Sequence, residues 1–173
     1  MRLLWRCVLV LAAVMAGPVL ALACGGGEEE LDLDEYFRRV EGNRQRLEAR
    51  VQEECETRPG DIAAASQCLE ATIPVARQLL DELKEIEPLA EVKDLHREYV
   101  TAQADALPVF EDFIQQVVSA DVESYSQWMA LFEEVGMPLA VNTVTDACLG
   151  LQRIADENEI DIDLDCAAEA EWP

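Results

Sequence analysis

Four cysteines downstream of residue 30 are the residues of this chain that are best placed for covalent chemistry. They are Cys55, Cys68, Cys148 and Cys166, an even number that permits three disulfide pairings. Chain proximity favours Cys55–Cys68 and Cys148–Cys166, and each bond would close a loop of about 15 residues, stabilising the fold by about 3 kcal/mol. The rival interpretation is a zinc site with four thiolate ligands. It is disfavoured because the chain contains no CxxC pair.

The chain has one histidine, His96, which limits its metal and acid–base chemistry. A ferritin-like di-iron bundle needs Glu-x-x-His on two helices, whereas the residue three before His96 is Lys93. We therefore expect His96 to be polar surface at a helix flank. The sequence also lacks a CxxCH haem-attachment motif, a G-x-S-x-G nucleophile turn and a phosphate-binding glycine loop. The many carboxylates single out no catalytic pair, so we expect no enzyme, no metal and no cofactor.

Asp161, Asp163 and Asp165 alternate along the chain like the first three ligands of an EF-hand calcium loop. The motif then fails, because Cys166 stands where glycine is needed and Trp172 where the final glutamate is needed. In an extended segment, alternation also places all three acids on one outward face. We therefore expect a solvated acidic edge here.

Cys24 ends an apolar run that begins after Arg6, and a stretch rich in glycine and glutamate follows it. A short basic region, an apolar core and small residues before a cut are typical of an export signal. The segment "LALAC" also resembles the lipobox of bacterial lipoproteins. This resemblance implies that residues 1–23 are a signal peptide, that Cys24 carries a lipid on its sulfur, and that residues 24–31 are a flexible acidic tether. An uncleaved membrane helix and a cleaved signal without lipid are the alternatives.

The chain is strongly acidic, with 36 Asp and Glu residues against 13 Lys and Arg residues and a formal net charge of −23. Without Arg2 and Arg6 the net charge is −25. Such a surface repels nucleic acid and anionic lipid head groups, so we expect no nucleic-acid partner. The plain interpretation is solubility at a crowded cell surface. The alternative is attraction of cations or of a basic envelope protein.

Apolar residues recur every three or four positions over most of residues 32–173, which predicts amphipathic helices. The first helix should follow Asp32, a helix N-cap with Glu35 as its reciprocal partner and with Leu31 packing on Tyr36. Its apolar stripe has a gap at Arg44. The members of the stripe are Leu33, Tyr36, Phe37, Val40, Leu47, Val51 and Cys55.

The second helix should start at an N-cap, Asp61, and end before Pro88, with Pro74 bending it. The third should run over about 91–119 and contain Pro108, where Asp105 could cap a restarted segment.

The fourth helix should begin at Asp121, break at "GMP", residues 136–138, and then resume to about Ala155. Because short turns make consecutive helices antiparallel, the sequence predicts an all-α, up-down four-helix bundle over residues 32–173 with Pro-broken helices.

The carboxyl end changes from a helical period to a period of two. In "EIDIDLDC", Ile160, Ile162 and Leu164 alternate with acids, which predicts an extended strap. The strap could fold back along the last helix and place Cys166 against Cys148. The stretch "ACLGLQRIADENEIDIDLDC" is similar to a carboxyl-terminal segment of uncharacterised bacterial lipoproteins, a resemblance that implies no activity.

The proline breaks at Pro74, Pro108 and Pro138 open helix packing locally, and the plain interpretation is that the helices curve around a core. The alternative is a ligand cleft near these breaks. Its expected lining is Tyr99, Phe110, Tyr125 and Trp128.

Together these patterns favour a lipid-anchored, non-enzymatic protein on the outer face of the bacterial cell membrane or on the outer membrane. We expect it to act as a protein-interaction or structural module. A small-ligand receptor with a cleft near the breaks is the alternative function.

Overall fold

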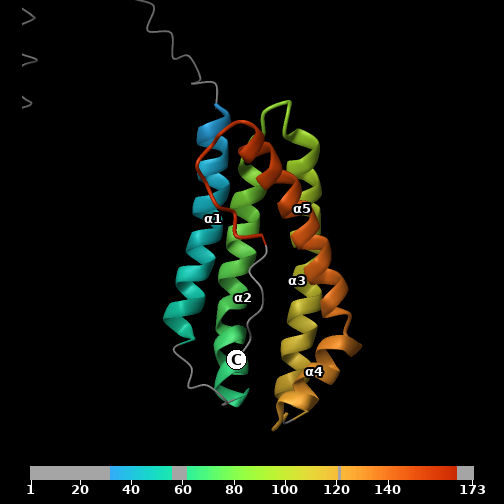
Figure 1. The fold of residues 1–173 in the computed structure, drawn as a ribbon. Coiled ribbons are helices and arrows are strands. Elements are labelled where there is room, and N and C mark those ends of the chain that lie inside the picture. The colour runs from blue at the N-terminus through green and yellow to red at the C-terminus, as the bar shows by residue number, and fades with distance from the viewer. Residues whose placement is uncertain (1–31, 56–61, 121, 167–173) are drawn as a thin grey trace, which may run out of the picture. The chain divides into compact units, whose positions relative to one another are not determined.

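The structure is a computed structural model that describes residues 32–55, 62–120 and 122–166. All of them belong to one structural unit of the chain. Within these ranges the chain is all-helical and contains no β-strand, which confirms the predicted all-α class. The helices are α1 (Leu33–Glu54), α2 (Ile62–Glu85), α3 (Lys93–Ser119), α4 (Tyr125–Glu134) and α5 (Met137–Glu157), shown in Figure 1.

The start of α1 follows the sequence signal in part. The side chain of Asp32 caps the helix by accepting a hydrogen bond from the backbone N–H of Glu35 at 2.7 Å, as predicted. The reciprocal bond, from the N–H of Asp32 to the Glu35 carboxylate, is not formed. The Glu35 carboxylate instead accepts a hydrogen bond from the Arg39 side chain, one turn later in α1. The expected contact of Leu31 and the expected cap at Asp61 lie outside the described residues.

The start of α4 differs from the prediction. Asp121 lies outside the described residues, and the helix begins only at Tyr125, after the N-cap Ser124. Ser124 and Gln127 form a capping box in which each side chain accepts from the backbone of the other residue. Val122 precedes this cap, so it lies outside the helix, and its side chain is buried.

The prolines behave in two ways. Pro74 and Pro108 lie inside α2 and α3. The expected restart at Asp105 is wrong, because α3 continues unbroken past Pro108 with buried side chains on both sides of it. The predicted break at "GMP" is confirmed. Gly136 adopts the left-handed conformation, with φ of 82°. Pro138 occupies the first turn of α5, where a backbone N–H would have no acceptor within the helix, so proline costs no hydrogen bond there.

The helices pack as successive pairs. α1 packs on α2, α2 on α3 and α3 on α5, while α4 contacts both α3 and α5. Figure 1 shows α1 beside α2 and α3 beside α5. Most of the buried apolar side chains form two clusters, here called the first core and the second core. The first core is Tyr36, Phe37, Val40, Leu83, Val92, Tyr99, Ala102, Ala147, Cys148, Leu151, Ala155 and Leu164. The second core is Cys68, Leu69, Phe113, Ile114, Val117, Val122, Trp128 and Met137.

The chain turns sharply at the end of α5. Ile160 N–H donates to the carbonyl of Ala155 at 3.0 Å, Glu159 N–H donates to that of Asp156, and Glu159 has a left-handed φ of 56°. These bonds define a Schellman motif with glutamate where glycine is usual. The following residues are neither helix nor strand.

Residues 158–166 return to the first core beside α5. The Gln152 side chain donates to the carbonyl of Ile162 at 3.1 Å and accepts from the N–H of Leu164 at 2.8 Å. Leu164 itself is buried in the first core. The last turns of α5 therefore hold the segment by polar bonds, while its leucine contributes apolar packing.

Candidate functional site

Both cysteine pairs expected from chain proximity lie at disulfide distance. The Cα atoms of Cys55 and Cys68 are 5.1 Å apart, and those of Cys148 and Cys166 are 5.4 Å apart. The first pair joins the end of α1 to the second core, and the other joins α5 to the returning segment beside the first core. The predicted lipid-attachment residue, Cys24, lies outside the described residues.

The four residues expected to line a cleft are not gathered at one place. Tyr99 belongs to the first core, whereas Trp128 belongs to the second core and Phe110 packs against it. Tyr125, in the first turn of α4, is 54% exposed. The aromatic residues near the breaks therefore contribute to core packing and surface rather than to a shared cavity.

The expectation that His96 is polar surface is wrong. His96 is only 5% exposed, and its Nδ1 lies 3.0 Å from the hydroxyl of Tyr36, a fully buried residue of α1. Burial lowers the pKa of His96, and burial, followed by the charge of Tyr99, raises the pKa of Tyr36. The pair is thus a neutral hydrogen bond between α1 and α3, and nothing in the sequence linked two residues so far apart.

Arg44, the gap in the apolar stripe of α1, also lies against the protein interior. Its Nη1 donates to Glu48 and to Asp165, each at 3.1 Å, so it ties α1 to the returning segment. Its Nε–H is buried and meets no acceptor within the described ranges. Burial raises the pKa of Tyr99, and the hydrogen bond with Gln103 and the charge of Arg44 oppose this rise only in part. The break in the stripe was the sequence signal for this inward cation.

The acidic residues 161, 163 and 165 are exposed, as predicted, but Asp165 also pairs with Arg44. The carboxylate of Asp163 accepts from the N–H of Asp165 at 2.7 Å. Within residues 32–55, 62–120 and 122–166, no group of three His, Cys, Asp or Glu side chains could hold a metal ion. In the same ranges no helix is both long and apolar enough to cross a membrane.

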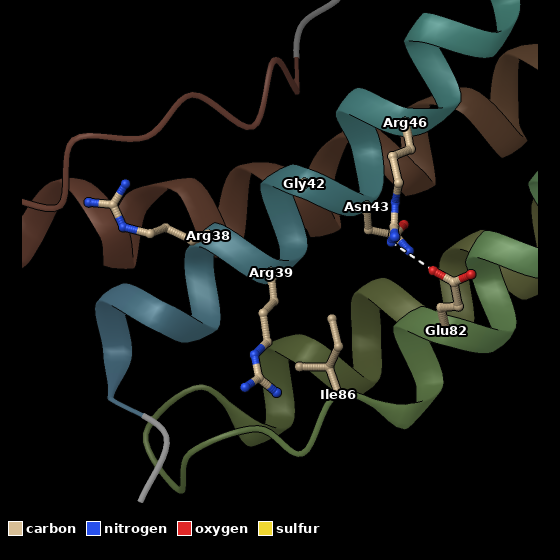
Figure 2. Close-up of a pocket in the computed structure, with 7 residues that line it drawn as sticks. All are labelled: Arg38, Arg39, Gly42, Asn43, Arg46, Glu82 and Ile86. Carbon is tan, nitrogen blue, oxygen red and sulfur yellow. Dashed lines mark hydrogen bonds and ion pairs between the residues drawn. The ribbon is translucent and has the colours of Figure 1, made fainter. Parts of the chain in front are cut away.

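A shallow groove lies between α1 and α2, and sequence reasoning missed it. It has a volume of about 420 Å³, within the usual range for small-molecule sites. Figure 2 shows its lining, which contains three arginines and a single acid. The lining residues are Arg38, Arg39, Gly42, Asn43, Arg46, Glu82 and Ile86.

Polar bonds fix the width of this groove. Asn43 Nδ2 donates to the carbonyl of Leu79 at 2.8 Å, and Arg46 pairs with Glu82 at 2.7 Å, so both bonds join α1 to α2. Figure 2 shows the Arg39 side chain reaching from α1 towards Ile86, the residue that follows α2. The groove therefore has guanidinium groups at its sides and aliphatic carbon at its base.

Gly42 leaves the α1 side of the groove open. A glycine inside a helix destabilises it by about 1 kcal/mol relative to alanine. Packing does not require this glycine, since a Cβ atom built at Gly42 would meet nothing within 4 Å. Its effect on the surface is to remove a side chain from the groove.

No protein-family model matches the chain, and comparison with curated proteins and with solved structures gives no match. The function is therefore inferred from the residues described above.

Proposed function

We propose that the protein is an exported, non-enzymatic protein-interaction or structural module, anchored by a lipid on Cys24 to the outer face of the bacterial cell membrane or to the outer membrane. The observation that carries the proposal is the presence of two cysteine pairs at disulfide distance. Disulfides persist in oxidising compartments outside the cytoplasm. An export signal over residues 1–23 agrees with that location.

The arrangement proposed for the body is an up-down four-helix bundle closed by a strap at its carboxyl end. In this arrangement α1, α2 and α3 are three arms, and α4 with α5 is the fourth arm, interrupted at Gly136. The successive packing of α1 on α2, α2 on α3 and α3 on α5 supports it. The bonds of Gln152 to the returning segment and the closeness of Cys148 to Cys166 support the strap.

The anchor can be tested by the intact mass of full-length protein extracted from membranes. We expect the mass of residues 24–173 plus a diacylglyceryl group, and we expect Cys24→Ser to remove the lipid and release the chain from the membrane. Cys7→Ser is the matched control, because Cys7 would leave with the signal peptide. Residues 1–23 still attached, or an amino terminus without lipid, would contradict the anchor.

The proposed partner is a basic envelope protein that recognises the acidic helical surface. Long-range attraction of this kind weakens as salt rises, since the Debye length falls from about 10 Å at 0.1 M to about 3 Å at 1 M. A pull-down of the membrane-extracted protein at low and high salt, read by mass spectrometry, should recover a basic protein only at low salt. Capture of a partner that is indifferent to salt would contradict a charge-based interface.

A receptor for a small ligand near Pro74, Pro108 and Pro138 is the less supported alternative. Such a site would require Tyr99 and Trp128 to line one cavity, although they belong to separate cores. A fluorescence titration of Trp128 with small apolar ligands tests it, and uniformly flat titrations would count against it.

A further inference from the structure

The basic residues of this acidic chain are concentrated on α1. Five of its 13 Lys and Arg residues lie between positions 38 and 50, all of them arginine. Three of these five line the groove between α1 and α2, and each is paired with an acid: Arg38 with Asp34, Arg39 with Glu35 and Arg46 with Glu82. Positive and negative charges are therefore balanced at this groove, whereas the whole chain is strongly acidic.

The helical register places the groove's polar groups on one side of α1. Arg39, Asn43 and Arg46 follow each other at spacings of four and three, so they share a helix face. Figure 2 shows the Arg39 and Arg46 side chains leaving α1 towards α2, with Ile86 between the helices. Two guanidinium groups thus flank a base of aliphatic carbon. This combination fits an oxyanion joined to a small apolar body.

The acids that pair with these arginines do not lock them. Arg39 pairs with Glu35 and Arg46 with Glu82, but the two arginine side chains are 53% and 59% exposed. Exposed ion pairs contribute little to stability, so a guanidinium can exchange its partner for a bound anion at little cost. The charges closest to the groove are those of its arginines and of the acids paired with them, Asp34, Glu35 and Glu82. A bound anion would take the place of these carboxylates at the guanidinium groups.

Gly42 leaves the α1 side of the groove without a side chain. It destabilises α1 and relieves no steric contact, since a Cβ there would lie in open space. A ligand can therefore approach the α1 backbone at this position.

We propose that the groove between α1 and α2 binds a small organic anion, a carboxylate or phosphate on an apolar body. Arg39 and Arg46 bind the oxyanion, while Gly42 and Ile86 contact the apolar part. This site is separate from the acidic surface proposed to meet a basic partner, and it does not depend on the lipid anchor.

The test is arginine modification of the full chain in a non-ionic detergent, with phenylglyoxal as reagent and peptide mass spectrometry as readout. Benzoate and phenyl phosphate are the probes, and benzamide is the uncharged control of similar shape. A probe at about twice its Kd should slow modification of Arg39 and Arg46 about threefold. A stronger effect of benzoate or of phenyl phosphate distinguishes a carboxylate from a phosphate ligand.

Arg97 is the internal reference, because it is an exposed arginine of α3 that is paired with Asp94 and lies outside the groove. Its modification rate should not change. No protection by either anion, equal protection of Arg97, or equal protection by benzamide would each overturn the proposal.

Two substitutions sharpen the test. Gly42→Leu should fill the groove and abolish protection of Arg39, whereas Ala49→Leu, on an exposed position of the same helix, should leave it unchanged. Arg46→Gln, which removes one guanidinium without adding bulk, should also lose the protection of Arg39. Wild-type protection in either groove variant would overturn the site. Circular dichroism of each variant separates loss of binding from loss of folding.

Discussion

The two cores hold the helices together by different means. In the second core the ring of Phe113 meets the rings of Trp128 and Phe132 edge to face, with centroid distances of 4.8 and 5.6 Å. The first core contains a buried hydrogen bond between Tyr36 and His96 and takes in Leu164 from the distant returning segment. Ring packing also occurs in the first core, where Tyr36 and Phe37 meet edge to face with centroids 5.1 Å apart. The first core therefore differs in its buried polar pair and in a segment that must return to it.

The comparison separates what a cysteine pair does from what the surrounding packing does. Each core lies beside one pair, and the loops are of similar length, with sequence separations of 13 and 18 residues. Chain entropy alone makes the two cross-links nearly equal. Any difference between them must come from the packing that each one secures.

Removing the pair beside the first core should have the largest effect. Cys148→Ala with Cys166→Ala should lower the free energy of unfolding by about 3 kcal/mol from chain entropy. The free energy of unfolding of this double variant should fall by about 1.5 kcal/mol more if Leu164 becomes exposed to water. The matched variant, Cys55→Ala with Cys68→Ala, should lose only the first amount. Urea unfolding measures both, and equal losses would show that Leu164 stays buried without its cross-link.

Phe113→Ala should break the second core at its centre. Phe113 is almost fully buried between two other rings, and truncation of such a residue costs about 3–5 kcal/mol in free energy of unfolding. Thermal and urea unfolding followed by circular dichroism measure the loss. Leu149→Ala is the control, because Leu149 is 46% exposed on α5 and should change stability by less than about 0.5 kcal/mol. Similar values for both variants would contradict the packing described.

Acid should destabilise the first core alone. Burial lowers the pKa of His96 in the folded state below its unfolded value of about 6.5, so the unfolded chain takes up a proton first. The stability that depends on neutral His96 is complete above this unfolded value and is lost as the pH falls through it. The second core has no side chain that titrates in this range.

The measurement is the free energy of unfolding at about pH 7.5 and about pH 5.5, for the wild type and for His96→Gln. The wild type should lose stability over this interval, and the variant should lose less. An identical pH dependence in both proteins would show that His96 is not the group responsible.

The smallest expected effect is a gain, at the turn that sends the chain back to the first core. Glu159 adopts a left-handed conformation that costs a non-glycine residue about 1–2 kcal/mol, partly offset in glycine by its flexibility in the unfolded chain. Glu159→Gly should therefore raise the free energy of unfolding by about 0.5 kcal/mol. Glu157→Gly, at the last residue of α5, should lower it by less than about 1 kcal/mol, the cost of a glycine in a helix interior. A loss in both variants would contradict the conformation described at Glu159.

Local signals in the sequence predicted much of the fold. The cap at Asp32 and the break at Gly136 depend on residues close in the chain, and both are present in the structure. The pairing of the cysteines was favoured by proximity alone. The restart at Asp105 was wrong because burial on both sides of Pro108 keeps α3 continuous.

The features that sequence reasoning missed depend on how helices rotate against one another. The bond of His96 to Tyr36 joins residues 60 positions apart, and the groove brings Arg39 and Arg46 opposite Ile86 only once α1 is packed on α2. The turn at Glu159 lacked its usual glycine, so no residue type marked it. Periodicity indicates which side of a helix is apolar, but not which polar group on the next helix it will meet.

The position of Tyr36 near the start of α1 has a mechanical consequence. A pulling force applied at the amino end reaches the described residues at Asp32 and is transmitted directly along α1. Tyr36, Phe37 and Val40 are buried within the first turns, so peeling the helix away requires all three to leave the first core almost together. Tension from that end is thus resisted by a short, dense patch of contacts before it can unravel the rest of the chain.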